Sequence, residues 1–198
     1  VSEWLAPIVI AKKPSGEIRL CVDLRSLNKA AVVDRHPIPN MTELLSLVGG
    51  AKFYSTLDLA SAYHQIRLHE ASQDLTAFIT PFGTYKFKRM PFGLVSDPSV
   101  FQRVMECPMK GIEGVCCYQD DVLICGELGD IHNQRLRQVL PCFRENGLTL
   151  RADKCKFGVG EISYLGHLLS VDGVRPKLDL VKTIESMPPP KSKEELMP

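Results

Sequence analysis

The chain has 198 residues, of which 44% are hydrophobic and 24% charged, and its formal net charge is +1. This composition is that of a globular protein, and no run approaches the ~20 apolar residues of a membrane-spanning helix, so we expect no membrane partner. The small net charge is weak evidence against a nucleic-acid-binding protein, because such proteins are often strongly basic, although a local basic patch can suffice.

A hairpin and a short helix are predicted in the first fifty residues. The stretches Ala6–Ala11 and Glu17–Leu24 flank the turn Pro14-Ser15-Gly16, which predicts a β-hairpin with lysines near its tip. Asn40 or Thr42 could cap a helix that ends before a Gly-Gly pair.

The middle of the chain predicts a strand and a second hairpin. Residues 53–59 read as a strand, whereas residues 60–68 fit either a strand or one turn of helix. The stretches 76–80 and 85–89 flank the turn sequence Pro81-Phe82-Gly83, and this pattern predicts a hairpin.

The second half predicts two helices and two strands besides the acidic hairpin described below. Helices are expected at residues 97–109 and 130–146, with a kink or break where Pro141 interrupts the second. Residues 148–150 and 162–169 read as strands. Because helices and strands alternate without a regular βαβ rhythm, the sequence predicts an α+β fold, with an antiparallel sheet packed on helices that cover one of its faces.

The seven cysteines form no CxxC pair. An odd number without such spacing indicates small buried side chains in a reducing compartment and argues against a zinc site. The chain opens with Val1 and nothing after it resembles a signal peptide, so we expect an intracellular piece of a longer polypeptide.

Two adjacent carboxylates interrupt an apolar run in the second half of the chain. Asp120 and Asp121 follow Tyr118-Gln119 and are flanked by residues 115–117 and 122–125, which are apolar and β-prone. Unpaired carboxylates are costly inside a strand. A hairpin whose tight turn carries both to one edge of the sheet avoids this cost, and a hard cation such as Mg²⁺ can neutralise them there.

A third carboxylate, Asp58, ends the apolar strand that starts at Phe53. If this strand pairs beside the hairpin, three carboxylates converge and repel one another, unless two Mg²⁺ ions join them into a phosphoryl-transfer site. Simpler readings remain open, because Asp favours turns and Asp58 could cap the segment that follows it.

Further motifs occur in order along nearly the whole chain, and in this order they are far more specific than a YxDD motif alone. The motifs are Trp4 to Val9, Arg19 to Asn28, Phe53 to Leu68, Thr76-Ala77-Phe78, Met90-Pro91-Phe92-Gly93-Leu94, Phe101-Gln102-Arg103, Tyr118 to Asp121, and Tyr164-Leu165-Gly166-His167. Together they resemble the reverse transcriptase domain of LTR retroelements, in particular gypsy-type retrotransposons and their retroviral and pararetroviral relatives.

The resemblance implies a right-hand polymerase fold. Residues 1–55 and 70–92 would form the fingers. Residues 56–69, with the first catalytic Asp, and residues 93–187, with the YQDD hairpin and a primer grip, would form the palm. Residues 188–198, which begin with three prolines, would be a stiff linker to a thumb that is absent or truncated.

The resemblance also implies a metal site. Asp58, Asp120 and Asp121 would hold two Mg²⁺ ions, for which Mn²⁺ can substitute, and the carbonyl of Leu59 would complete one coordination shell. Lys154 would protonate the pyrophosphate leaving group, although Lys156 is also available and Lys154 could instead be a solvated surface charge.

Five residues would contact the incoming nucleotide by the same resemblance. Arg19, together with Lys12 or Lys13, would reach its phosphates from the fingers hairpin. Tyr63 stands at the steric-gate position that favours deoxynucleotides, and Phe92 would line the pocket. Taken singly, Arg19 could be a solvated edge residue, Tyr63 a core aromatic and Phe92 a packing residue.

Other residues would contact nucleic acid or depart from the family pattern. Gln102 and Arg103 would face the template, and Tyr164 to His167 would form the primer grip. Gln119 stands where the family usually has an aliphatic residue or Met, and Cys107-Pro108 would break a helix that usually continues.

The sequence therefore predicts an RNA-directed DNA polymerase, which transfers dNMP to a primer 3′-OH with an RNA or DNA template, a primer and dNTPs as partners. The alternative is an inactive or domesticated retroelement fragment with at most nucleic-acid binding. A host replication polymerase is a third reading, against which the MPFGL and YHQI blocks argue. We expect a location in the cytoplasm, a virus-like particle or the nucleus, and the sequence leaves the oligomeric state open.

Overall fold

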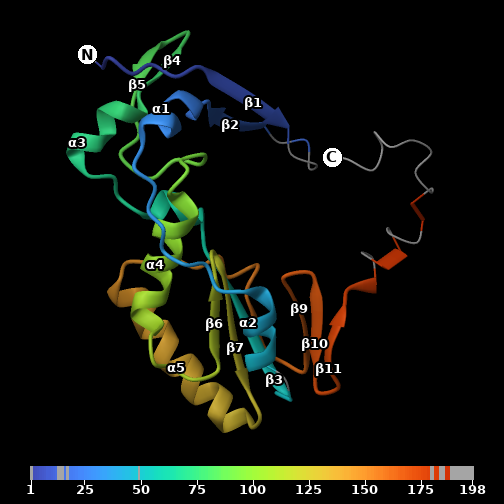
Figure 1. The fold of residues 1–198 in the computed structure, drawn as a ribbon. Helices are drawn as coiled ribbons and strands as arrows, with labels where there is room; N and C mark the ends of the chain where they lie inside the picture. Colours follow the sequence, from blue (N-terminus) through green and yellow to red (C-terminus); the bar gives the residue numbers. More distant parts are fainter. Residues whose placement is uncertain are drawn as a thin grey trace.

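The structure is a computed structural model that describes residues 2–12, 16, 18–48, 50–178, 181–182 and 186–187. Figure 1 shows two parts joined by extended segments, with the N-terminal elements in the upper part and the largest sheet in the lower part. The expected proline linker and the end of the chain lie outside the described residues. No helix in the described part is both long and apolar enough to cross a bilayer.

The lower part is built on a four-stranded antiparallel sheet with the strand order β6-β7-β3-β8. Its strands are β3 (Phe53–Asp58), β6 (Val115–Tyr118), β7 (Asp121–Gly126) and β8 (Lys156–Val159). Strands β6 and β7 form the predicted hairpin, and β3 lies beside β7, so the two acidic segments are neighbours. Strand β8 was not predicted.

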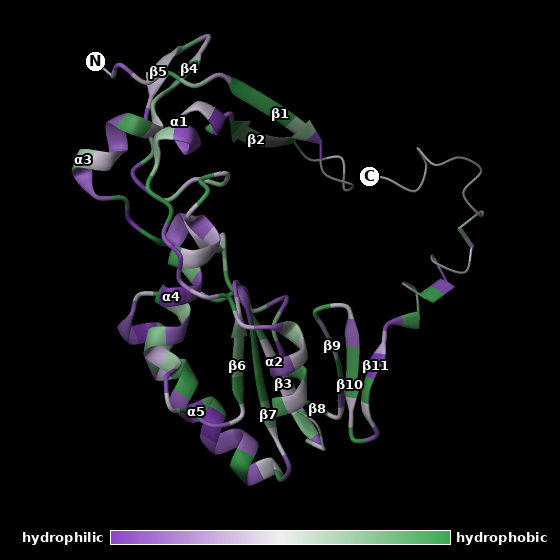
Figure 2. Cartoon of the chain, viewed as in Figure 1, coloured by the Kyte–Doolittle hydropathy of each residue, from purple (hydrophilic) through white to green (hydrophobic). Residues whose placement is uncertain are grey.

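Both faces of this sheet are covered, so the expectation of helices on one face is wrong. Helices α4 (Asp97–Met109) and α5 (Gly129–Glu145) pack on one face around Val122 and Ile124. The other face, around Leu123 and Cys125, is covered by α2 (Met41–Leu47) and β9 (Glu161–Tyr164). Successive residues of a strand point to opposite faces. A strand buried on both sides therefore needs a continuous apolar run, which Figure 2 shows in β6 and β7.

A smaller sheet continues from β9 with the order β11-β10-β9, formed with β10 (His167–Ser170) and β11 (Gly173–Pro176). The prediction of one strand over residues 162–169 is wrong, because the chain reverses at Leu165-Gly166. Both residues have positive φ (47° and 79°), which is the requirement of the tight type I′ hairpin turn. The predicted strand at 148–150 is reduced to a single bridge between Leu150 and Leu59.

The upper part contains two hairpins. The first is β1 (Ile8–Lys12) with β2 (Ile18–Val22), and the second is β4 (Phe78–Thr80) with β5 (Gly83–Tyr85), so the second hairpin is shorter than the predicted strands 76–80 and 85–89. Short helical segments complete this part: α1 (Arg25–Ala30), η1 (Ala62–Gln65), α3 (Glu70–Gln73) and η2 (Asp74–Thr76).

Helix ends follow the sequence signals closely. The side chain of Asn40 accepts a hydrogen bond from the N–H of Thr42 (2.9 Å), so Asn40 and not Thr42 caps α2. Helix α4 continues through Pro108 to Met109, and α5 continues through Pro141, so neither proline breaks its helix. Pro108 stands in the last turn, where the helix ends within two residues.

Phe101 is the central aromatic residue between α4 and the sheet, and it is fully buried. Truncation to Ala should leave a cavity and lower the free energy of unfolding by about 3–5 kcal/mol. The matched control is Phe82→Ala, because Phe82 is 90% exposed and should cost under about 0.5 kcal/mol. Urea titrations of both variants measure the difference, and equal losses would contradict the assignment of Phe101 to the core.

Asp97, the first residue of α4, is only 4% exposed, and its Oδ2 accepts a hydrogen bond from the N–H of Leu94 (2.8 Å). Burial raises the pKa of Asp97 from 3.8 to about 7, opposed by the backbone hydrogen bonds from Leu94 and Gly93. Between pH 3.8 and about pH 7, the carboxyl of Asp97 is ionised in the unfolded chain but still protonated in the folded protein. The contribution of Asp97 to stability should therefore fall as the pH rises from about 4 to about 7 and stay constant above that.

Asp97→Asn keeps an acceptor oxygen and stays neutral, so it should remove this pH dependence. Relative to the wild-type protein, the variant should gain on the order of 2–4 kcal/mol of unfolding free energy between pH 4 and pH 7.5. Urea titrations at several pH values give the comparison, with Asp172→Asn as the control for loss of an exposed carboxylate. A constant difference between variant and wild-type protein would refute burial of a protonated Asp97.

Candidate functional site

The acidic motif lies in the turn of the β6–β7 hairpin. Tyr118 pairs with Asp121, so Gln119 and Asp120 are the two turn residues. Gln119 has a φ of 53°, and a positive φ at the first turn position is the feature of a type II′ hairpin turn. This conformation is unfavourable for a residue other than Gly, and the surrounding contacts must hold it.

The contact that holds the turn comes from Gln102 on α4, whose side chain is fully buried. Its Oε1 accepts a hydrogen bond from the N–H of Gln119 (2.7 Å), and its Nε2 donates to the carbonyl of Cys117 (2.9 Å). The prediction that Gln102 faces the template is therefore wrong. Sequence reasoning missed this role because a Gln on a helix next to Arg103 reads as a surface residue.

The pairing of β3 with β7 places Asp58 directly opposite Asp121. Asp58 is half-buried, whereas Asp120 and Asp121 are exposed at the edge of the sheet. Partial burial of its carboxyl, followed by the negative charges of Asp120 and Asp58, raises the pKa of Asp121. Asp120 and Asp58 are thus close enough to Asp121 for their charges to act on its carboxyl.

These carboxylates have the donor chemistry of a hard cation site. None of the ion pairs among the described residues includes Asp58, Asp120 or Asp121, so their charges are not neutralised by a neighbouring cationic side chain. In the described part of the chain, however, no three acidic, His or Cys side chains converge closely enough to hold a metal ion. The residue types fit a divalent cation, and the side chains are not gathered around one point.

The segment that follows α5 is held against the end of β3. The N–H of Arg151 donates to the carbonyl of Asp58 (2.8 Å), and the N–H of Asp58 donates to Sγ of Cys155 (3.4 Å). Leu59 and Leu150 stand opposite each other as a pair that makes no hydrogen bonds of its own, because the hydrogen bonds here run between their neighbours. The carbonyl of Leu59 is therefore not used by this bridge. Lys154 is exposed in this turn, and Cys155 is a contact of Asp58 that the sequence did not reveal.

Tyr63 and Phe92 come together beside the acidic turn. Their ring centroids are 5.2 Å apart in an edge-to-face arrangement, and Tyr63 also contacts Phe101 at 4.9 Å. Burial, followed by the negative charges of Asp120 and Asp97, raises the pKa of Tyr63. Tyr63 is thus half-buried and lies within electrostatic range of Asp120, while Phe92 is 41% exposed.

The predicted phosphate contacts lie on the β1–β2 hairpin in the upper part of Figure 1. Lys12 ends β1 and is exposed, and Arg19 pairs with Ala11 in the backbone register. The side chain of Arg19 and the whole of Lys13 lie outside what the structure describes, so only the hairpin itself is established here.

The predicted primer-grip segment also reaches the acidic hairpin. Tyr164, at the end of β9, is buried, and its hydroxyl donates to the carbonyl of Asp121 (3.1 Å). Burial is the main cause that raises the pKa of the Tyr164 phenol, so the hydroxyl remains a donor at neutral pH. The β9–β10 turn, with Leu165 and His167, is therefore fixed next to the carboxylates.

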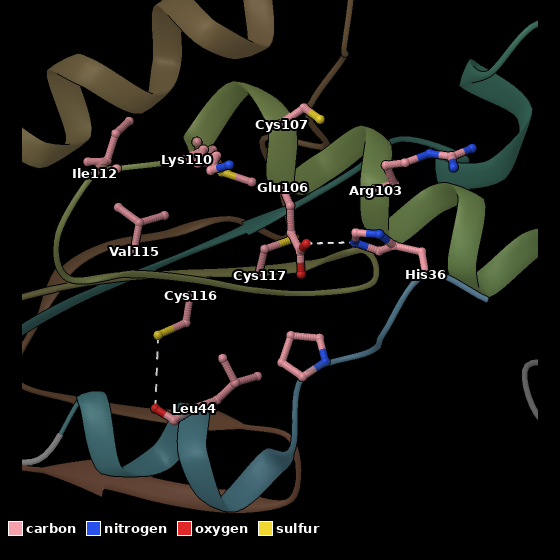
Figure 3. Close-up of a pocket in the computed structure, with 13 residues that line it drawn as sticks. His36, Leu44, Arg103, Glu106, Cys107, Lys110, Ile112, Val115, Cys116 and Cys117 are labelled. Atoms are coloured by element: carbon pink, nitrogen blue, oxygen red, sulfur yellow. Dashed lines mark hydrogen bonds and ion pairs between the residues drawn. The ribbon is translucent and has the colours of Figure 1, made fainter. Parts of the chain in front are cut away.

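A pocket of about 400 Å³ lies between α4, β6 and α2, and Figure 3 shows its lining. On one side, His36 Nε2 and Glu106 Oε2 are 2.8 Å apart. Glu106 also accepts a hydrogen bond from Gln102 (2.6 Å), so His36 and Glu106 are linked to Gln102, the residue that holds the acidic turn. None of the predicted catalytic or nucleotide-contacting residues lines this pocket, so we do not count it as part of the catalytic site.

Comparison with known proteins gives consistent results. A family profile described as "Reverse transcriptase (RNA-dependent DNA polymerase)" matches residues 10–169. The chain is 36% identical over 197 residues to the retrovirus-related Pol polyprotein from transposon opus of Drosophila melanogaster, covering 98% of this chain and 19% of that protein. It is 37% identical over 174 residues to the corresponding polyprotein from transposon gypsy, covering 87% and 17%. The chain thus spans less than a fifth of these relatives.

Solved structures share the fold. The foamy viral protease-reverse transcriptase in complex with double-stranded DNA matches with a TM-score of 0.92 and 24% identity, covering 99% of this chain and 35% of that chain. The same protein in complex with an RNA/DNA hybrid matches with a TM-score of 0.87, covering 99% and 26%. The antiparallel sheets and helices described above are therefore a reverse transcriptase fold. With the profile match over most of its length, the chain belongs to the reverse transcriptase family.

Proposed function

We propose that the chain is the fingers and palm part of an RNA-directed DNA polymerase, which extends a primer 3′-OH with dNMP on a template strand. One observation carries the proposal: the register of β3 and β7 sets Asp58 opposite Asp121, with Asp120 in the adjoining turn. These carboxylates lie at the exposed end of the two inner strands and have no cationic side chain beside them. They suit a reaction in which metal ions and phosphates supply the opposite charge.

Each residue has a defined task in this proposal. Asp58, Asp120, Asp121 and the Leu59 carbonyl would hold two Mg²⁺ ions, or Mn²⁺ in their place. When bound, such ions activate the primer hydroxyl and stabilise charge on the transferred phosphoryl group. Lys154 would donate a proton to the pyrophosphate, for which its exposed position in the turn held against Asp58 gives room.

The remaining contacts divide between nucleotide and nucleic acid. Tyr63, held by Phe92 and Phe101, would crowd a ribose 2′-OH, and Arg19, Lys12 and Lys13 would bind the triphosphate. The turn after Tyr164 would position the primer end. The foamy viral relatives of this fold are described as complexes with DNA or an RNA/DNA hybrid, which supports a template and primer as partners here.

The division into fingers and palm is also part of the proposal, with the boundaries 1–55, 56–69, 70–92 and 93–187 and a thumb linker from 188. The first boundary falls inside β3, a single strand of the four-stranded sheet. Helix α2 also packs on this sheet, so the packing unit of the palm includes residues that precede position 56.

The seven cysteines, all free thiols, agree with a reducing compartment, which we take to be the cytoplasm, a virus-like particle or the nucleus.

Asp120→Asn should abolish incorporation of dTTP on poly(rA)/oligo(dT) with Mg²⁺ or Mn²⁺, because one ligand charge is lost at the reacting centre. We expect a reduction of at least about 100-fold. Asp130→Asn, an exposed Asp at the start of α5, is the matched control and should keep full activity. The assay uses a longer chain that also carries a thumb, and if its wild-type form incorporates no more than Asp120→Asn, the alternative of an inactive retroelement fragment holds.

Tyr63→Val should relax sugar selection, because it removes the ring that would contact the 2′-OH. The ratio of kcat/KM for dTTP to that for UTP should fall by about 10-fold or more, corresponding to at least about 1.4 kcal/mol of lost discrimination. Tyr85→Val, at an exposed position on β5, is the control. An unchanged ratio in Tyr63→Val would remove Tyr63 from the nucleotide site.

A further inference from the structure

A second pocket, of about 550 Å³, lies between two segments of the upper part, and its lining does not include the acidic turn. Its lining is strongly basic and contains none of the residues assigned above to the metal ions or the nucleotide. The lining residues are Arg67, Leu68, His69, Glu70, Gln73, Lys88 and Arg89.

The backbone fixes where two of these cations lie. Arg67 and Arg89 pair across a short antiparallel bridge, flanked by the hydrogen bonds from Met90 N–H to the Ile66 carbonyl (2.9 Å) and from Leu68 N–H to the Lys88 carbonyl (3.0 Å). This is the pair type that makes no hydrogen bonds of its own and brings side chains closest. Like charges in such a pair are destabilising.

The same ladder explains why Arg67 and Arg89 face outward. Ile66 and Leu68 pack against the core around Phe101, so Arg67 between them, with its partner Arg89, points to the opposite face. Lys88 stands opposite Leu68 in this register, and it is exposed and lines the pocket. The core therefore determines the side on which the two arginines lie.

Their charges are not balanced within the described protein. Lys86, on the same segment, is ion-paired with Asp74 (2.6 Å). None of the ion pairs among the described residues includes Arg67, Lys88 or Arg89. With the carboxylate of Glu70 counted, the lining carries +2 while the whole chain carries +1, so the pocket is a basic region in a nearly neutral chain.

Two lining side chains have directed donors. Arg89 Nη1 donates to the carbonyl of Gln65 (2.6 Å), which fixes its guanidinium at the rim. His69 Nδ1 accepts a hydrogen bond from the N–H of Ala71 (3.3 Å), which leaves its Nε2–H as a donor. Guanidinium and ammonium groups arranged in this way match phosphate oxygens.

We propose that this pocket binds the phosphodiester backbone of a nucleic-acid strand outside the catalytic centre. The choice of ligand rests on the proposed function. All three cations are exposed, and the lining has no glycine whose backbone could wrap around a free phosphate. Exposed cations of this kind suit a strand that passes over the surface better than an enclosed phosphate ion. Arg89 stands three residues before Phe92, at most about 11 Å along the chain. A strand at the Tyr63–Phe92 pair can therefore reach the pocket.

The test compares two double variants in binding to a labelled single-stranded RNA. Arg67→Gln/Lys88→Gln removes two cations for which no hydrogen bond or ion pair is described, so folding should be kept. Arg137→Gln/Arg144→Gln removes two exposed cations of α5 as the matched control. Fluorescence anisotropy is measured over a range of salt concentrations without dNTP or divalent metal, so that absence of polymerisation does not affect the result.

We expect the pocket variant to bind RNA about tenfold more weakly, with the slope of log Kd against log salt reduced by about 1.4, or 0.7 for each lost phosphate contact. The control should match the wild-type protein. Equal affinity and slope in all three proteins would overturn the proposal. Titration with inorganic tripolyphosphate separates the remaining case: loss of tripolyphosphate binding with unchanged RNA binding would assign the pocket to a free polyphosphate and also overturn it.

Discussion

The pairing of β3 with β7 is the interaction on which the rest of the site depends. It aligns two strands whose paired residues are 63 to 73 positions apart in sequence, and a shift of one residue would turn Asp58 and every core residue of β3 to the other face. Because both faces are packed, such a shift would move side chains from one core into the other and disrupt the packing of both. The position of the carboxylates is thus fixed by the hydrophobic core and not by attraction between them.

This arrangement explains how neighbouring carboxylates persist in a stable fold. Partial burial, followed by the negative charges of Asp120 and Asp58, raises the pKa of Asp121. Around them, bonds to the main chain hold the backbone: Gln102 binds the turn, Tyr164 binds the carbonyl of Asp121, and Arg151 binds the carbonyl of Asp58. The local electrostatic cost is therefore carried by the surrounding packing, as is common where a ligand is expected to supply the missing charge.

The sequence predicted the parts of the site that depend on periodicity and local chemistry. The hairpin at Tyr118, the strand that ends at Asp58 and the cap at Asn40 all follow from short patterns. It failed where the outcome depends on a distant partner. Gln102 reads as a surface residue until the hairpin is docked on α4, and the turn at Leu165-Gly166 was hidden because apolar residues run through it. Strand β8 is mostly exposed, and its four residues give no clear hydrophobic period.

The bond between Gln102 and the acidic turn has a consequence for position 119. Gln102 binds the main chain at the N–H of Gln119 and at the carbonyl of Cys117, two residues earlier. These contacts hold the positive φ of position 119, which is unfavourable for any residue except Gly and most of all for β-branched ones, and they use no atom of the side chain at position 119. Differences at this position between members of the family can then reflect what the turn meets on its outer side, and carry little information about how the fold is maintained.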